Sequence, residues 1–317
     1  MFEKIGKLIS QHDTITIFGH IHPDGDCYGC QIGLREIIKS RYPEKKVYAI
    51  GSGLPDFFSL ISPMDKVSDE IIKNSLAIIV DANDLTRIED KRVKLAKAFA
   101  KIDHHVDLHT FTEGEEIINE DGNSAAELIV DFAIEQHYEI NKTAANALYL
   151  GILTDTNRFQ YCSDFERAFD TCKFLIEKGA IPSKIYEILN KRDESFLRFA
   201  GAIYSKYQKT SGGTIYFVMD KNQIAKFEGF DALDVANKVN LIGNVKGYKI
   251  WVAFVEREDG RLSAEFRSNE FDVQSIACKY GGGGHVHASG MTVGKFDLNF
   301  IKQVLNDCDE LIKKESK

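Results

Sequence analysis

Histidine and aspartate side chains that could bind metal ions occur at four separate points of this chain. Residues 20–26 read HIHPDGD, residues 103–105 read DHH, and Asp81 and Asp155 each follow an apolar stretch. Carboxylates suit hard ions such as Mg²⁺ and Mn²⁺, and neutral imidazole shifts the preference toward Mn²⁺ or another transition ion. Taken singly, each point also has an ordinary explanation, such as a solvated turn or a helix cap. Taken together, they predict a site for two divalent ions.

Two ions that share one bridging carboxylate favour the hydrolysis of phosphate esters. Ions about 3.5–4 Å apart can clamp the attacking and leaving oxygens of a phosphoryl displacement. They also acidify a bound water, so that hydroxide is available near neutral pH. The residue types therefore indicate attack by a metal-activated hydroxide on a phosphoester.

Apolar stretches explain how these residues could meet. Residues 14–18, 47–50, 76–80 and 98–102 read as buried strands, and helical patterns fill the gaps between them. This alternation predicts an α/β domain with a mostly parallel sheet and helices on both faces. In such sheets ligands bind at the carboxyl ends of the strands. The polar clusters follow three of the four strands, at the edge where a site is expected.

The second half of the chain predicts a smaller α+β domain after a helical region at 124–199. The expected second-domain elements are strands at 214–218, 249–255 and 262–266, helices at 273–279 and from 299 onward, and a turn at 259–260. We therefore predict three parts: a metal-binding catalytic domain at 1–185, a helical connector at 186–208 and a substrate-binding domain at 209–317.

Size and charge restrict the function further. A chain of 317 residues is comfortable for two domains, and its net charge of −8 argues against binding long nucleic acid. A small anionic substrate stays compatible with that charge. No apolar run reaches the roughly 20 residues that span a bilayer, and no secretory signal is visible, so we expect a cytoplasmic protein without membrane partners. Cys27 and Cys30 form a C-x-x-C pair, which we interpret as structural helix residues rather than a redox or zinc motif.

The order of the motifs resembles the DHH phosphoesterase superfamily over nearly the whole chain. The motifs H-x-x-P-D-G-D, an isolated strand-end Asp, D-H-H and G-x-x-T-D appear at residues 20–26, 81, 103–105 and 151–155. The second half resembles the DHH-associated domain of that superfamily through Arg267-Ser268 and the GGGGH run at 281–285. The closest branch contains compact oligoribonucleases and phosphoadenosine-phosphate phosphatases.

The resemblance implies a role for each residue of the first domain. One ion would be held by two residues, His20 and Asp24. The other ion would be held by Asp26, His104 and Asp155, with Asp81 bridging the two. Asp103 would orient a histidine, and His105 would face the substrate phosphate, so that Asp81, Asp103 and His105 form the catalytic set. The implied cofactor is a pair of divalent ions, with Mn²⁺ favoured.

Residues of two kinds could bind the substrate. The cationic ones are Arg158, which could instead pair with Asp164, and Arg267, which could instead be a surface residue. The glycine run could be a flexible loop, or its backbone N–H groups could approach an anion closely. Through the resemblance we expect the substrate contacts to be His105, Arg158, Arg267, Gly282, Gly283, Gly284 and His285.

The resemblance implies hydrolysis of short oligoribonucleotides to mononucleotides, and of 3′-phosphoadenosine 5′-phosphate to AMP. The alternative within the superfamily is a phosphodiesterase for cyclic or linear dinucleotides, such as c-di-AMP or pApA. A family II pyrophosphatase and a RecJ-like DNA exonuclease fit less well. The alternative outside enzymes is a non-catalytic nucleotide sensor, which a missing ligand would favour, and none is missing. The expected partners are a short RNA or a dinucleotide, and a homodimer is compatible with the sequence.

Overall fold

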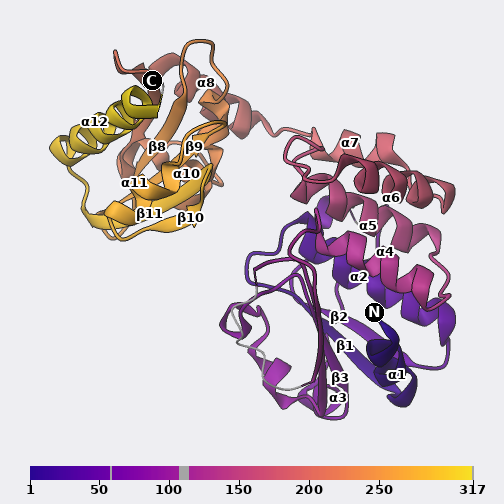
Figure 1. The fold of residues 1–317 in the computed structure, drawn as a ribbon. Helices are drawn as coiled ribbons and strands as arrows, with labels where there is room; N and C mark the ends of the chain where they lie inside the picture. Colours follow the sequence, from indigo (N-terminus) through magenta and orange to yellow (C-terminus); the bar gives the residue numbers. More distant parts are fainter. Residues whose placement is uncertain (58, 107–113, 316–317) are drawn as a thin grey trace. The chain divides into compact units, whose positions relative to one another are not determined.

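The computed structural model describes residues 1–57, 59–106 and 114–315. The chain forms two compact units, Met1–Lys191 and Arg192–Lys317, each with its own sheet (Figure 1). In the part of the chain that the structure describes, every helix is too short or too polar to cross a bilayer.

The first unit contains a five-stranded sheet in which every pairing is parallel. Its strands, in spatial order, are β2 (Lys46–Ile50), β1 (Thr14–Phe18), β3 (Leu76–Val80), β4 (Ala98–Asp103) and β5 (Glu115–Ile118). The parallel sheet predicted from the apolar stretches is confirmed. The edge strand β5 was not predicted, because its sequence EEII carries only two apolar residues.

Helices cover both faces of this sheet, as predicted. One face packs against α1 (Glu3–Gln11), α2 (Gly25–Arg41), α4 (Ala125–Glu135) and α5 (Lys142–Asp155) (Figure 1). This core extends to α6 (Phe165–Glu177) and α7 (Pro182–Leu189). The opposite face packs against α3 (Asp69–Lys73) and the 3₁₀ turns η2 (Leu85–Arg87) and η3 (Lys91–Leu95), and its core is smaller. A third 3₁₀ turn, η1 (Pro55–Phe57), follows β2.

Glycines let α2 and α5 approach closely, which brings the start of α2 beside the end of α5. A Cβ atom at Gly29 would come within 2.4 Å of the carbonyl oxygen of Ala147. At Gly25 it would come within 2.3 Å of Thr154 Oγ1, one residue before Asp155. The helix that follows the HIHPDGD segment is therefore pressed against the helix that ends at Asp155.

The second unit contains a six-stranded mixed sheet, in which only β7 and β8 pair in parallel. Its strands, in spatial order, are β10 (Gly283–His285), β11 (Ala288–Lys295), β9 (Arg261–Ser268), β8 (Ile250–Glu256), β7 (Thr214–Met219) and β6 (Gln208–Lys209). The predicted hairpin at residues 259–260 joins β8 to β9.

Helices lie on both faces of the second sheet as well. One core contains residues of α11 (Val273–Lys279) and α12 (Leu298–Glu315), and the other contains residues of α8 (Glu194–Lys206) and α10 (Ala232–Asn237), with η4 (Lys238–Ile242). The short helix α9 (Lys221–Ile224) follows β7. The predicted α+β character is confirmed. The predicted boundaries at 185 and 208 stay a prediction, and α8, inside the predicted connector, buries Phe199 and Ile203 within the second unit.

Candidate metal centre and substrate surface

The register of the parallel sheet aligns three of the candidate residues. Phe18 on β1 lies opposite Ile79 on β3, and Ile79 lies opposite Lys101 on β4. His20 and Asp81 come within two residues after the ends of β1 and β3, and Asp103 is the last residue of β4. The sheet thus delivers one polar side chain from each of three strand ends to a single place.

Asp81 lies between two histidines. Its Oδ2 atom is 3.4 Å from His20 Nε2, and its Oδ1 atom is 3.5 Å from His104 Nε2. Each histidine faces a second carboxylate: His104 Nε2 is 3.2 Å from Asp155 Oδ2, and His20 Nε2 is 3.9 Å from Asp24 Oδ1. This is the arrangement that a carboxylate shared by two ions requires. The backbone of Asp81 has a positive φ of 54°, which turns the chain at the end of β3.

Asp26 is fully buried at the start of α2. Its two carboxylate oxygens accept hydrogen bonds from the backbone N–H groups of Ala125 and Ala126, at 2.8 and 3.1 Å, where α4 begins. One ligand atom each from Asp26, His104 and Asp155 lie within 4.8 Å of one another. Three elements far apart in sequence therefore supply one candidate ion site.

Asp24 occupies a more exposed position than the other five candidate ligands. Its Oδ1 atom caps α2 by accepting hydrogen bonds from the N–H groups of Asp26 and Cys27, each at 3.0 Å. The Cys27 thiol also lies near this cluster, grouping with His20 and Asp81 within 4.8 Å. Its Sγ atom accepts a hydrogen bond from the His20 N–H group at 3.3 Å. Cys27 and Cys30 are both buried on α2, in agreement with the structural interpretation of the C-x-x-C pair.

Each of three histidines uses Nδ1 for a supporting contact. His20 Nδ1 lies 2.9 Å from the Ile21 carbonyl oxygen, and His104 Nδ1 lies 3.2 Å from the Gly122 carbonyl oxygen. In His105, Nδ1 lies 2.8 Å from Asp103 Oδ1. Such contacts fix the ring and leave Nε2 to face a ligand. The expected role of Asp103 in orienting a histidine therefore has a specific candidate, His105.

The electrostatics of this cluster fit divalent cations. Among the residues that the structure describes, the buried atoms Asp81 Oδ1 and His104 Nε2 make no hydrogen bond. Burial raises the pKa of Asp155 to about 6, with the carboxylates of Asp81 and Asp24 adding to the effect. Burial, followed by Asp81 and Asp155, also raises the pKa of Asp26. Crowded carboxylates raise one another's pKa values when no cation is near, and a bound divalent ion lowers those pKa values.

The histidines show the complementary effect. Burial lowers the pKa of His104, but Asp81, Asp155 and Asp26 outweigh burial and raise it to about 10. Burial also lowers the pKa of His20, but the carboxylates of Asp24 and Asp81 outweigh burial and raise it. In the protein without metal, protons on these rings provide the positive charge that the carboxylates attract.

Arg158 follows Asp155 in an unusual turn. The three residues 157–159 all have positive φ angles, between 45° and 67°, although none is glycine. The turn is held by Thr156, whose Oγ1 accepts a hydrogen bond from the Phe159 N–H group at 3.0 Å. Arg158 Nη2 donates to Asn190 Oδ1 at 3.2 Å, while Asp164 caps α6 through the Arg167 N–H group. Strained backbone of this kind costs about 1–3 kcal/mol per residue and clusters at functional sites.

Strand pairing in the second unit places His285 and Arg267 on one face. His285 on β10 lies opposite Ala288 on β11, and Ala288 lies opposite Arg267 on β9. Directly opposed side chains share a face. The small residue Ala288 therefore lies between the exposed His285 and Arg267, whose Nη1 donates to Glu265 Oε2 at 2.9 Å.

The surroundings of the three candidate glycines differ in whether they leave room for a side chain. A Cβ atom at Gly282 would come within 2.3 Å of the Gly290 carbonyl oxygen. At Gly284, where φ is 131°, it would come within 2.7 Å of the Ala288 carbonyl oxygen. At Gly283 it would meet nothing within 4 Å. Strand pairing thus explains two of the glycines and leaves Gly283 open to another explanation.

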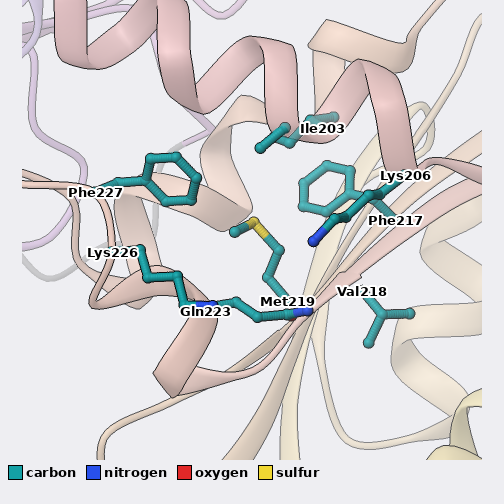
Figure 2. A pocket seen from close by; sticks show the side chains of 9 residues that line it. Ile203, Lys206, Phe217, Val218, Met219, Gln223, Lys226 and Phe227 are labelled. Atoms are coloured by element: carbon teal, nitrogen blue, oxygen red, sulfur yellow. The ribbon is translucent and has the colours of Figure 1, made fainter.

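A small cavity in the second unit lies elsewhere. It measures about 50 Å³ and is lined by Ile203, Phe217, Met219 and Phe227, with Lys206, Gln223 and Lys226 at its rim (Figure 2). For comparison, an apolar cavity of about 150 Å³ holds one benzene ring. Strands β8, β9 and β11 separate β7, which lines the cavity, from β10. The cavity is therefore too small for a nucleobase and distinct from the face that carries His285.

Comparisons with known proteins agree with this architecture. The model of the DHH family, N-terminal domain, matches residues 14–152, and the DHHA1 domain model matches residues 201–314. The chain is 36% identical to the bifunctional oligoribonuclease and PAP phosphatase NrnA of Mycoplasma pneumoniae, over 96% of this chain and 94% of that protein. It is 32% identical to the protein of the same name from Bacillus subtilis, over 97% of both chains.

A solved structure has a similar fold throughout. The exopolyphosphatase-related protein from Bacteroides fragilis superimposes with a TM-score of 0.86 at 24% identity, covering 98% of this chain and 97% of that one. Fold and site together define a phosphoesterase of the metal-dependent type. The chain belongs to the DHH family and carries a DHHA1 domain, which confirms the resemblance that the motifs suggested.

Proposed function

We propose that this protein hydrolyses short oligoribonucleotides to mononucleotides and removes the 3′-phosphate of 3′-phosphoadenosine 5′-phosphate. The observation that carries the proposal is the position of Asp81 between His20 and His104, with buried ligand atoms that make no hydrogen bond within the described residues. Relatives named bifunctional oligoribonuclease and PAP phosphatase, 36% and 32% identical over nearly the full length, support the substrate class.

The metal centre would use six side chains. Asp81 would contact both ions, and the remaining ligands would be His20, Asp24, Asp26, His104 and Asp155. When bound, two ions supply an activated water and stabilise the charge that develops on the phosphate. Imidazole in the ligand set favours Mn²⁺ over Mg²⁺, which prefers oxygen ligands in octahedral geometry.

The protein's own groups would bind and orient the phosphate. His105, held by Asp103, would donate from Nε2 to a non-bridging oxygen. Arg158, adjacent to the metal centre in sequence, would neutralise charge on the same group. In the second unit, His285 and Arg267 would contact a neighbouring phosphate or the nucleoside, and Gly283 lies two residues before His285 on β10. The net charge of −8 is consistent with short substrates rather than polymers.

The experiment is a hydrolysis panel with products resolved by length. Purified protein is incubated with Mn²⁺ and with RNA of two to ten nucleotides, with 3′-phosphoadenosine 5′-phosphate, and with EDTA in parallel. We expect mononucleotides from the shortest RNAs, AMP from the bisphosphate, and no product in EDTA. Turnover of neither substrate with two bound ions would contradict the proposal.

A dinucleotide phosphodiesterase is the second candidate. The cyclic-di-AMP phosphodiesterase GdpP of Geobacillus thermodenitrificans is 24% identical over 95% of this chain, although the match spans only 48% of that protein. Adding a cyclic dinucleotide and its linear form to the panel separates the two activities. A rate on the cyclic dinucleotide above the rate on two-residue RNA would favour this second function.

A further inference from the structure

A lysine is buried beneath the candidate metal centre. Lys101 lies on β4, two residues before Asp103, and only 1% of its side chain is exposed. On one side its neighbours in register, Ile79 and then Phe18, are apolar and buried, and on the other side it lies opposite the exposed Glu116 of β5. A lysine is almost never buried without a charged partner, because desolvating its ammonium group is costly.

The partner that the structure places beside it is Asp103. Lys101 Nζ lies 3.6 Å from Asp103 Oδ2, and the Asp103 side chain has no exposed surface. The other oxygen, Oδ1, is fully used: it accepts from the N–H groups of His104 and His105 and lies 2.8 Å from His105 Nδ1. Within the described residues, Oδ2 accepts no hydrogen bond, so Lys101 provides its closest charged contact.

The charges around the candidate metal centre explain why a lysine would contact Asp103 here. Five carboxylates lie in or beside the centre, at Asp24, Asp26, Asp81, Asp103 and Asp155. Two divalent ions would offset four negative charges. Lys101 lies next to the fifth, that of Asp103, and approaches Oδ2 rather than the oxygen that contacts His105.

We propose that Lys101 is a positioning residue of the phosphoesterase reaction, which holds Asp103 and, through it, the His105 ring. Because its Nζ contacts Oδ2 while the histidine contacts Oδ1, the lysine keeps the carboxylate in the one orientation that serves His105. The inference rests on the proposed function, since its main readout is hydrolysis. It assigns Lys101 no contact with substrate.

The test is a double-mutant cycle of Lys101→Met with Asp103→Asn, measured on two-residue RNA. Methionine keeps the length of the side chain and removes its charge. We expect Lys101→Met to lower kcat about tenfold or more with KM changed less than about twofold, because the lysine orients a catalytic group and binds no substrate. In the Asp103→Asn background the same substitution should change kcat less than about twofold, because its target is already lost.

Two readouts do not depend on activity. Lys101→Met should leave Mn²⁺ affinity unchanged or tighter, since it removes a cation near the ions. In metal-free protein it should lower Tm more when Asp103 is present than when Asp103→Asn is present, because the contact between Lys101 and Asp103 is already lost in the second background. The difference in Tm between the two backgrounds measures that contact without an activity assay.

Lys45 is the matched control. It is the other buried lysine of the first unit in the described residues, with 8% of its surface exposed, and its Nζ donates to the carbonyl oxygens of Ser10 and His12. Lys45→Met should lower Tm and leave kcat within about twofold of the parent. A parental kcat for Lys101→Met, or an equal tenfold loss with and without Asp103, would overturn the inference. Failure of the parent protein on every substrate would instead reject the proposed function.

Discussion

The metal centre of the first unit and the His285 face of the second are built in opposite ways. The candidate metal centre collects mostly buried side chains from the ends of three parallel strands and from two helices that close glycine contacts hold together, and Asp24 is its exposed member. The His285 face lies on three adjacent antiparallel strands, with an exposed histidine and a small residue between its polar groups. A rigid, buried centre suits chemistry and ion binding, and an open face suits substrate recognition. Substitutions in the first region should therefore reduce metal binding, whereas substitutions in the second should reduce substrate binding.

Asp81→Ala should have the largest effect. Asp81 faces both His20 and His104, so its removal should weaken both ions at once and lower kcat/KM by about a thousandfold or more. Metal content measured on the purified variant should fall together with activity. Two bound ions at near-parental turnover would show that Asp81 does not bridge.

The Arg267→Ala and His285→Ala variants should retain both metal ions but act less efficiently on nucleotide substrates. We expect kcat/KM on a dinucleotide to fall about ten- to a hundredfold, as for the loss of charge-assisted contacts. A nitrophenyl phosphodiester should lose less, because it makes few remote contacts. Rates on both substrates, with metal content checked, test the division of labour. A parental rate on the dinucleotide would mean that the second unit does not read the substrate.

The candidate metal ligands could be selected from the sequence because several of them follow apolar strands. A strand of apolar residues ends where polar residues begin, so the positions of Asp81 and of the DHH segment relative to the sheet could be inferred from the pattern alone. The parallel topology then required that these ends meet. What the pattern could not provide is the pairing of side chains, such as Asp103 with His105, since two histidines, His104 and His105, follow Asp103 in the sequence.

Other features were invisible for specific physical reasons. Lys101 interrupts an apolar strand, and alternation alone would place such a lysine in solvent, whereas the structure buries it against Asp103. Arg267 was expected to bind phosphate, and local sequence did not reveal that its Nη1 donates to Glu265, two positions earlier on the same face of β9. The different reasons for Gly282 and Gly283 depend on strand pairing with β11, which local sequence does not specify.

The pH dependence of stability should separate the metal-free and metal-bound protein. The folded pKa of Asp155 is raised to about 6 and that of His104 to about 10, so the folded state binds more protons than the unfolded state. Stability of the metal-free protein should therefore fall as pH rises through these ranges, by up to about 3 kcal/mol for Asp155 alone. Mn²⁺ binds the deprotonated ligands, so its stabilisation should grow with pH.

Tm measured from pH 4.5 to 8 in EDTA and in excess Mn²⁺ provides the check. The two curves should diverge as pH rises, with the metal-free curve lying lower. A variant with Asp81→Ala should reduce that divergence, because both ions bind it weakly. Parallel curves for the parent protein would show that the cluster does not exchange protons for metal.

Gly282→Ala and Gly283→Ala should give the smallest and most discriminating effects. A Cβ atom at Gly282 meets the Gly290 carbonyl oxygen at 2.3 Å, so alanine must distort the β10–β11 pairing, with an expected cost of about 1–3 kcal/mol. A Cβ atom at Gly283 meets nothing within 4 Å, so alanine should change Tm by less than about 1 °C. If the backbone at Gly283 approaches the substrate, the added methyl should raise KM for a dinucleotide several-fold while leaving kcat on a nitrophenyl phosphodiester unchanged. Thermal unfolding and the two kinetic assays, run on both variants, distinguish a packing role from a substrate role. A Gly283→Ala protein with parental Tm and parental KM would assign the glycine run to strand pairing alone and leave recognition to His285 and Arg267.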